Sequence, residues 1–226
     1  MPNTKRRATI TLLGAPVVAV TILAGVWVAG GVITSDFRTS IALTTAWFAV
    51  SAAVCLLIAR RWRPLRIPVI AAYLVTVGAT AAYLAATTLR DDVVHEHVIM
   101  AVAPPASTIG GAARSGPVEL AQGPFRSHEH ATKGTARVIR ATDGRRFLTL
   151  TEFATSPGPD LRVRLVPAGL FDGGADGAVD LGGLKGNRGD QQYAIPSGTN
   201  ATGRTVVIWC RAFSAPFGSA ALRPMA

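Results

Sequence analysis

The chain has 226 residues, is 49% hydrophobic and carries a formal net charge of +10. Its basic residues form two clusters beside hydrophobic runs in the N-terminal half and are scattered among Asp and Glu in the C-terminal half. Because nucleic-acid-binding proteins gather their basic residues on one folded surface, this distribution argues against nucleic acid as a partner.

Three long apolar runs occupy the N-terminal part of the chain, at about residues 8–33, 41–59 and 67–87, and none contains a charged residue. A helix rises about 1.5 Å per residue and the hydrocarbon core of a bilayer is about 30 Å thick, so roughly 20 residues cross it. The small residues of these runs also suit close helix packing in lipid. We therefore predict three transmembrane helices, with residues 1–88 forming a helical membrane anchor.

Two alternatives exist for these runs. The first run follows a basic segment, as a cleaved signal peptide would, but it is longer than the usual apolar region of about 7–15 residues and two further runs follow. A soluble helical bundle is the other alternative, and it is disfavoured because no face of the runs is polar. Since ionisable residues within spans usually mark transport paths or cofactor ligands, their absence favours a simple anchor in the lipid bilayer.

The short loops predict the orientation of the anchor. Basic residues without acids precede the first run, and four arginines fill the loop at residues 60–66, whereas Asp36 and Arg38 balance each other in the loop between them. The positive-inside rule places the N-terminus and the loop at 60–66 in the cytoplasm. With three crossings, we expect a multi-pass protein of the cell membrane whose C-terminal domain is extracytoplasmic.

Residues 89–116 are predicted to link the anchor to a C-terminal domain. The stretch 103–116 contains closely spaced Pro and Gly residues and is typical of a flexible linker. The preceding stretch, Val93–Val102, either extends the third helix or forms a short strand.

From residue 117 to 226 the pattern consists of short apolar runs separated by turn residues. Asp143-Gly144 is a hairpin signal, residues 156–160 read as a turn, and residues 173–183 read as a Gly-rich loop. The continuous apolar run Thr205–Cys210 suits a central strand that is covered on both faces. The other strands are expected at 134–141, 146–153, 161–165, 189–195 and 213–222. This pattern predicts an all-β domain, either a β-sandwich or a partly closed barrel.

Cys210 is the main candidate functional residue, because the other cysteine, Cys55, lies in an apolar run and no CxxC motif is present. One interpretation is a reactive thiolate or metal ligand, which requires nearby cations or a metal to lower the thiol pKa. Arg211 is adjacent, but on a strand it would point to the opposite face. The other interpretation is a buried cysteine that acts as a small hydrophobe.

Several other residues are candidate ligands for a metal or cofactor. On a strand, His128 and His130 would share one face and could bind a metal, with Cys210 as a third ligand; a polar loop is the alternative. His95-Glu96-His97 repeats this pattern within the linker. Trp209 and Phe213, together with Phe217, would line a pocket beside Cys210 or serve as core aromatics.

The C-terminal half also resembles a known family, through residues 122–222. The similar segments are Gly123-Pro124-Phe125, His128, Gly134-Thr135-Ala136, residues 153–161, 184–187, 189–196 and 206–210, Phe213 and Phe217-Gly218-Ser219-Ala220. Together they resemble the electron-transfer DM-thirteen (DM13) domain family. The resemblance implies an extracytoplasmic β-domain in which Cys210 matches the signature cysteine, acting as a bare thiol or holding a group such as haem.

Two functional hypotheses follow. The first is a membrane-anchored extracytoplasmic redox module centred on Cys210, with haem or no cofactor, copper being less favoured, and with a redox protein as partner. The second is a non-catalytic binding module in which Cys210 is a core residue. The sequence contains no nucleophile elbow and no phosphate-binding loop, so no motif supports a hydrolase or transferase function.

Overall fold

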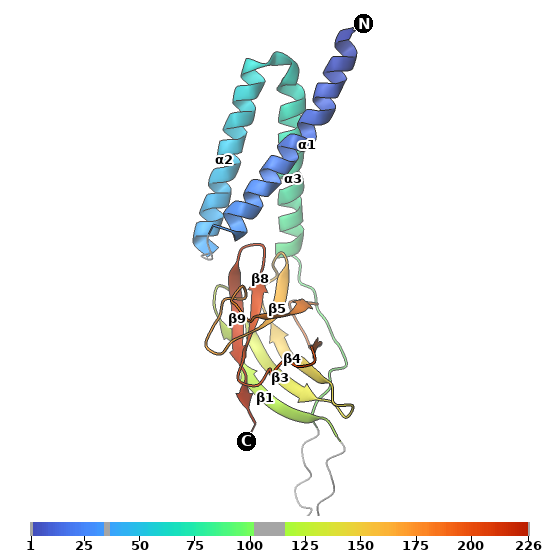
Figure 1. The fold of residues 1–226 in the computed structure, drawn as a ribbon, viewed down its shortest axis with the longest axis vertical. Coiled ribbons are helices and arrows are strands. Elements are labelled where there is room, and N and C mark those ends of the chain that lie inside the picture. Colours follow the sequence, from blue (N-terminus) through green and yellow to red (C-terminus); the bar gives the residue numbers. More distant parts are fainter. Residues whose placement is uncertain (1, 34–36, 102–115, 226) are drawn as a thin grey trace, which may run out of the picture. The chain divides into compact units, whose positions relative to one another are not determined.

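The computed structural model describes residues 2–33, 37–101 and 116–225 (Figure 1). The chain divides into a helical unit in its N-terminal part and a β unit that begins at Thr88. Each unit is described by itself below.

The helical unit consists of α1 (Pro2–Gly31), α2 (Phe37–Arg61) and α3 (Arg66–Thr88), with the short 3₁₀ helix η1 (Arg63–Leu65) before α3. The stretches Arg38–Arg61 and Arg63–Thr88 are long and apolar enough to cross a membrane. In α1, the apolar stretch measured within the described side chains is the shorter Ala15–Ala29. Two of the three predicted spans are thus long and apolar enough to cross a membrane, and the first span stays a prediction.

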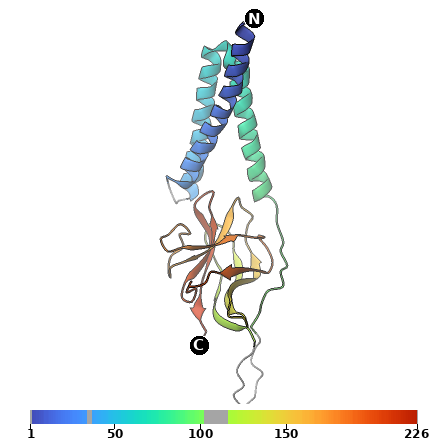
Figure 2. The ribbon, with the colours of Figure 1, turned by 45° about the vertical axis from the view of Figure 1, so that its right-hand side comes forward.

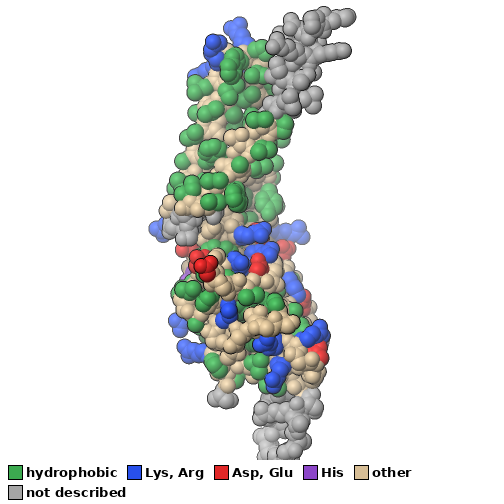
Figure 3. Space-filling model, viewed as in Figure 1, with side chains coloured by type: hydrophobic (Ala, Val, Ile, Leu, Met, Phe, Trp, Pro, Cys, Tyr) green, Lys and Arg blue, Asp and Glu red, His purple; other side chains and the backbone are tan. Residues whose placement is uncertain are grey.

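The helices pack through a small residue and through side-chain hydrogen bonds. Gly25 faces the Trp47 indole so closely that a Cβ atom at this position would overlap the ring. Trp47 Nε1 donates to the Ile22 carbonyl at 3.1 Å, and the Tyr73 hydroxyl donates to the Phe48 carbonyl at 2.9 Å. These bonds satisfy polar groups that lipid would leave without partners. Most other large side chains of this unit are apolar and exposed (Figure 3), as lipid-facing residues are.

The β unit contains two five-stranded sheets whose neighbouring strands are all antiparallel (Figure 2). Their strand orders are β10-β1-β3-β4-β7 and β2-β9-β8-β5-β6. The strands span β1 Val118–Pro124, β2 Arg126–Ser127, β3 Lys133–Arg140, β4 Arg146–Ala154, β5 Leu161–Val166, β6 Val179–Gly183, β7 Gln191–Ile195, β8 Thr205–Cys210, β9 Ala215–Ala221 and β10 Arg223–Pro224. The predicted all-β class is confirmed, and its arrangement as a sandwich stays a prediction.

Several strands lie where the sequence places them. β8 is the third strand of its sheet and all six of its residues are buried, as expected for a strand covered on both faces. The structure differs at residues 173–183, because the last part of this Gly-rich loop forms the edge strand β6. Here Asp180 lies opposite Arg164 and Gly182 has a φ of +119°, a conformation that glycine tolerates.

Residues 91–99, predicted as part of a linker, form an extended segment bound to the β unit, which we call the strap. Val93 makes a parallel bridge with Arg188. The Val94 amide donates to the Arg188 carbonyl at 2.9 Å, and the Glu96 amide donates to the Asp190 carbonyl at 3.0 Å. Of the two conformations left open for Val93–Val102, the strap therefore takes the extended one. The Pro/Gly-rich stretch that follows lies largely outside the described residues.

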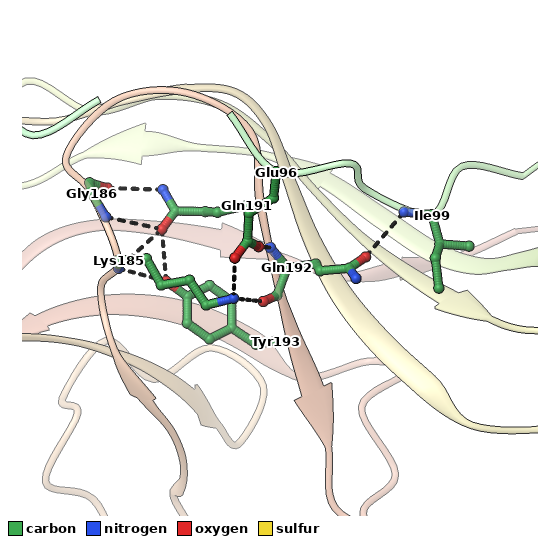
Figure 4. A network of polar contacts seen from close by, with 7 residues as sticks. All are labelled: Glu96, Ile99, Lys185, Gly186, Gln191, Gln192 and Tyr193. Carbon is green, nitrogen blue, oxygen red and sulfur yellow. Dashed lines mark hydrogen bonds and ion pairs between the residues drawn. The ribbon is translucent and has the colours of Figure 1, made fainter. Parts of the chain in front are cut away.

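Side chains fasten the strap to the edge strand β7 (Figure 4). The Glu96 carboxylate accepts from Lys185 Nζ at 2.5 Å and from the Gln192 amide at 2.8 Å. The Gln192 side chain in turn accepts from the Ile99 amide at 3.0 Å. Burial by itself would raise the pKa of Glu96. The bonds from Lys185 and Gln192 outweigh it and hold the pKa of Glu96 below its ordinary value.

A buried polar cluster supports the same edge from within the β unit (Figure 4). The Gln191 side-chain oxygen accepts from the Tyr193 hydroxyl at 2.7 Å and from the Lys185 amide at 3.1 Å. Gln191 Nε2 donates to the Gly186 carbonyl at 2.8 Å, so both ends of this fully buried amide are paired. Burial raises the pKa of Tyr193 far above its ordinary value, which keeps this hydroxyl a hydrogen-bond donor.

Candidate functional site

Cys210 is the last residue of the central strand β8 and lies between two partner strands. It is opposite Leu161 of β5 on one side and Ala215 of β9 on the other. The side chain is 0% exposed, although Leu161 and Ala215 are the first residues of β5 and β9 and neither strand continues past the thiol. Like the other five residues of β8, Cys210 lies in the interior of the β unit.

A turn at residues 156–160 covers the thiol. The Cys210 thiol donates to the carbonyl oxygen of Pro159, with Sγ 3.2 Å away. Gly158 packs so tightly on Phe217 that a Cβ atom there would lie 2.8 Å from the ring. Because glycine alone leaves room for this approach, the Ser-Pro-Gly-Pro sequence brings the Pro159 carbonyl down onto the thiol.

An ion pair holds this turn in place. Arg211 Nε lies 2.6 Å from the Asp160 carboxylate, and the Arg211 amide donates to the Asp160 carbonyl at 3.1 Å. Asp160 has a φ of +55°, a left-handed conformation that Asp adopts more readily than most residues. Arg162 adds a more distant contact at 3.9 Å. Cys210 and its neighbour Arg211 thus act on the same turn, one from inside and the other from the surface.

Sequence reasoning missed this role of Arg211. It treated Arg211 as a strand residue facing away from the thiol, but β8 ends at Cys210 and alternation stops there. The available signal was Asp160, the half-buried acidic residue that closes the Pro-Gly-Pro turn and needs a partner for its charge. Sequence separation of 51 residues hides this pairing.

Trp209 lies on the opposite face of β8 from Cys210, as alternation along a strand requires. It packs with Val166 and Val207 and is 5% exposed. Gly173 of the loop between β5 and β6 approaches its ring closely. Phe213 lies in the turn between β8 and β9. The structure therefore does not place Trp209 in a pocket beside the thiol, and Phe217 is the aromatic that contacts the turn covering it.

His128 and His130 follow the end of β2 and lie in a bend, so the strand periodicity used to pair them does not apply. His128 Nε2 is 2.8 Å from Ser219 Oγ, and its ring stacks near Phe171. His130 packs on Phe217 with ring centroids 3.9 Å apart. Burial lowers the pKa of His130, although the neighbouring Glu129 carboxylate acts in the opposite direction.

These residues do not fit the metal or haem predicted from the sequence. Ser219, the partner of His128, lies opposite Val207, and three residues along a strand separate Val207 from Cys210 by about 10 Å. Within the described residues, no group of three or more His, Cys, Asp and Glu is close enough to bind a metal ion. The thiol is fully enclosed and donates a hydrogen bond to the Pro159 carbonyl, which leaves no face for a haem iron. His95 and His97 lie exposed on the strap.

Chemically, the site is a protonated thiol in a closed interior under a turn that is fastened at the surface. Thiol reactions require the thiolate and access to the sulfur. Neither condition is met in this structure, because the thiol donates a hydrogen bond to the Pro159 carbonyl and Arg211 holds Asp160 in the turn that covers the sulfur. In this closed arrangement the sulfur is shielded from reagents in solution.

Comparison with known proteins gives one match. Residues 124–222 match the model of the family described as Electron transfer DM13. The match covers the C-terminal part of the chain, contains Cys210 and the turn above it, and confirms the resemblance found from the sequence. No curated protein and no solved structure matches the chain.

Proposed function

We propose that this chain is a membrane-anchored, extracytoplasmic electron-transfer module whose redox group is the Cys210 thiol itself. The observation that carries the proposal is the match of residues 124–222 to an electron-transfer family, because Cys210 is the sole cysteine of that segment. Two apolar helices, α2 and α3, support attachment to a membrane. The basic residues in the first turns of α1 and around η1 support a cytoplasmic N-terminus.

A single cysteine limits the chemistry that this module performs. The domain cannot store two electrons as an internal disulfide, so it exchanges with a disulfide of a partner protein. The Cys210 thiolate attacks one sulfur of that disulfide, forms a mixed disulfide and releases the other sulfur as a thiolate, which takes up the proton. One thiol of a separate dithiol partner then attacks the Cys210 sulfur of the mixed disulfide and releases the first partner's remaining cysteine as a thiolate. The second thiol of the dithiol attacks this new mixed disulfide, forms the dithiol partner's own disulfide and frees Cys210, so two electrons have passed from the dithiol to the first partner.

The turn at 156–160 controls access to the sulfur in this proposal. Attack on a partner disulfide needs an approach that the Pro159 carbonyl blocks in the closed form. The exposed Arg211–Asp160 pair is the contact that a partner could replace, because Arg211 is 63% exposed. Docking then favours an open form that the free protein visits only briefly, so small oxidants outside the cytoplasm react with the thiol slowly and a docked partner reacts quickly.

A second function is supported by the burial of the same residue. Cys210 is 0% exposed, as a cysteine that merely fills a core position is. In that case the β unit is a binding module and the thiol takes no part in its action.

The two functions are separated by mixed-disulfide formation in the full chain, held in lipid nanodiscs and carrying Cys55→Ser. The protein is equilibrated with glutathione and its disulfide at several ratios, and intact mass reports the adduct at Cys210. The redox function predicts an adduct under native conditions that dithiothreitol removes and that Cys210→Ser lacks. An adduct that forms only in denaturant would assign Cys210 to the core and favour the binding module.

The orientation has its own test. Single cysteines replace Asp143 in the β unit and Arg63 in η1, in a chain lacking Cys55 and Cys210. A membrane-impermeant maleimide added to intact cells should label Asp143→Cys and spare Arg63→Cys until the membrane is permeabilised. The reverse pattern would overturn the proposed topology.

A further inference from the structure

The β unit contains a cavity of about 350 Å³ at the edge of the β10-β1-β3-β4-β7 sheet. Its walls come from β1, β3 and β10, which are neighbours in that sheet. This volume lies at the lower end of the range for small-molecule sites, about 300–1,000 Å³. The cavity does not involve Cys210 or the turn that covers it, so it is independent of the proposed redox function.

The charged lining of the cavity consists of Arg137 and Arg223, and none of the residues described around it is acidic. Arg137 is already paired, since its Nη1 lies 3.1 Å from the Glu119 carboxylate and 2.7 Å from Gln122 Oε1. Arg223 is exposed, and no described residue forms an ion pair with it. The cavity therefore carries about one uncompensated positive charge, at Arg223.

Apolar walls accompany this charge. Pro124, Pro224 and Met225 line the cavity beside the arginines. A site with apolar walls and a few placed polar groups is typical for a ligand that has an apolar body and one charged end. Gln122 of β1 and Thr135 of β3 add hydrogen-bonding groups to the lining of the cavity.

The strands hold this site in a fixed shape. β1 pairs with β3 from Val118 to Pro124 and with Arg223 and Pro224 of β10. Gly123 lies so close to the Ala221 carbonyl that no Cβ atom fits between them, which locks β1 against the end of β9. A ligand would thus meet a preformed cavity, which reduces the entropy lost on binding.

We propose that this cavity binds a small monocarboxylate with a compact apolar body, through a salt bridge from Arg223. A planar guanidinium matches a carboxylate with two parallel hydrogen bonds. A monoanion suits the single uncompensated charge, whereas a phosphate dianion would bring a second negative charge that has no partner in the cavity. Pro124, Pro224 and Met225 contact the apolar body.

The test uses 4-fluorobenzoate as the probe and the full chain in lipid nanodiscs. Fluorine NMR line broadening reports binding, and empty nanodiscs give the background from lipid partitioning. Broadening by the protein should exceed that background, and 4-fluorobenzyl alcohol, which lacks the charge, should bind at least tenfold more weakly. Arg223→Gln should weaken 4-fluorobenzoate binding at least tenfold, while Arg140→Gln, an exposed arginine at the far end of β3, should leave it unchanged.

The outcomes decide the proposal. No broadening above the empty-nanodisc background would overturn it, as would equal binding by the Arg223→Gln variant. Tighter binding of 4-fluorophenyl phosphate than of 4-fluorobenzoate would overturn the monocarboxylate assignment. Equal unfolding temperatures for Arg223→Gln and the parent chain would show that lost binding is not lost folding.

Discussion

Arg211 Nε lies 2.6 Å from Asp160 Oδ2, and this pair closes the turn whose Pro159 carbonyl accepts a hydrogen bond from the Cys210 thiol. A surface ion pair and a buried thiol are thereby linked through one short turn. The thiol cannot become accessible unless this turn moves, so the ion pair is the first contact to test.

Removing the ion pair should make the thiol more reactive. An exposed pair contributes about 0.2–1 kcal/mol, so Arg211→Gln should raise the open population roughly 1.5- to 5-fold. The rate of Cys210 alkylation by iodoacetamide, measured by mass spectrometry in the Cys55→Ser chain, should rise by the same factor. The control is Arg145→Gln, which breaks the equally short pair with Asp143 in the β3–β4 hairpin. Equal rates in Arg211→Gln and its parent would contradict the role given to the pair.

The strap should loosen when the Glu96 carboxylate is lost. Hydrogen bonds to a charged group contribute about 1.5–3 kcal/mol, so Glu96→Gln should speed hydrogen exchange at the Gln192 and Val94 amides about 10- to 100-fold. Exchange measured by mass spectrometry on peptides covering 91–99 and 191–195 tests this. Glu152→Gln, an exposed carboxylate on β4, should leave both peptides unchanged. Unchanged exchange in Glu96→Gln would mean that backbone bonds alone hold the strap.

The same contact gives the strap a pH dependence of known sign. The folded pKa of Glu96 is lowered, so its stabilising contribution is complete above the ordinary Glu value of about 4.3 and is lost as pH falls through the folded value. Strap exchange, corrected for the intrinsic rate, should therefore accelerate only in acid. This acceleration should be absent from Glu96→Gln.

His130 should make the β unit less stable in mildly acidic solution. Its folded pKa is lowered by burial, so stability falls as pH drops below the ordinary value of about 6.5 and levels off below the folded value. His130→Phe preserves a ring against Phe217 and removes the proton-binding group. The unfolding temperature of the variant, followed by tryptophan fluorescence, should lose that part of the pH dependence. A parent chain with no fall between pH 7 and pH 5 would contradict this prediction.

Thr149→Val should stabilise the β unit. Thr149 is 0% exposed, and its Oγ1 is buried without a hydrogen-bond partner among the described residues. Valine has nearly the same shape and removes an unpaired hydroxyl, whose burial costs about 1–3 kcal/mol. The unfolding temperature should rise by roughly 4–8 °C per kcal/mol gained. Thr151→Val on the same strand, where the side chain is only half-buried, is the control, and an equal or larger rise there would contradict the explanation.

The all-β class and several strands were predictable from the sequence because their signals are local. Alternation along Leu161–Val166, the Asp143-Gly144 turn and the apolar run of β8 each depend on neighbouring residues only. The edge strand β6 escaped this reasoning, because its glycines hide the alternation and its pairing with β5 supplies the order. The apolar helices also depend on local composition, which is why α2 and α3 could be located to within a few residues.

By itself, the sequence determined the apolar helices, the β class of the C-terminal half, the resemblance of that half to the electron-transfer DM13 family, and the position of Cys210 as its sole cysteine. Only the tertiary structure decided that Cys210 is enclosed beneath Pro159, that Arg211 fastens the turn, and that Trp209 faces away. It also decided that the strap belongs to the β unit through Glu96 and Lys185. Local patterns act over a few residues, whereas these contacts join residues 51 and 89 positions apart, and chain topology alone brings such residues together.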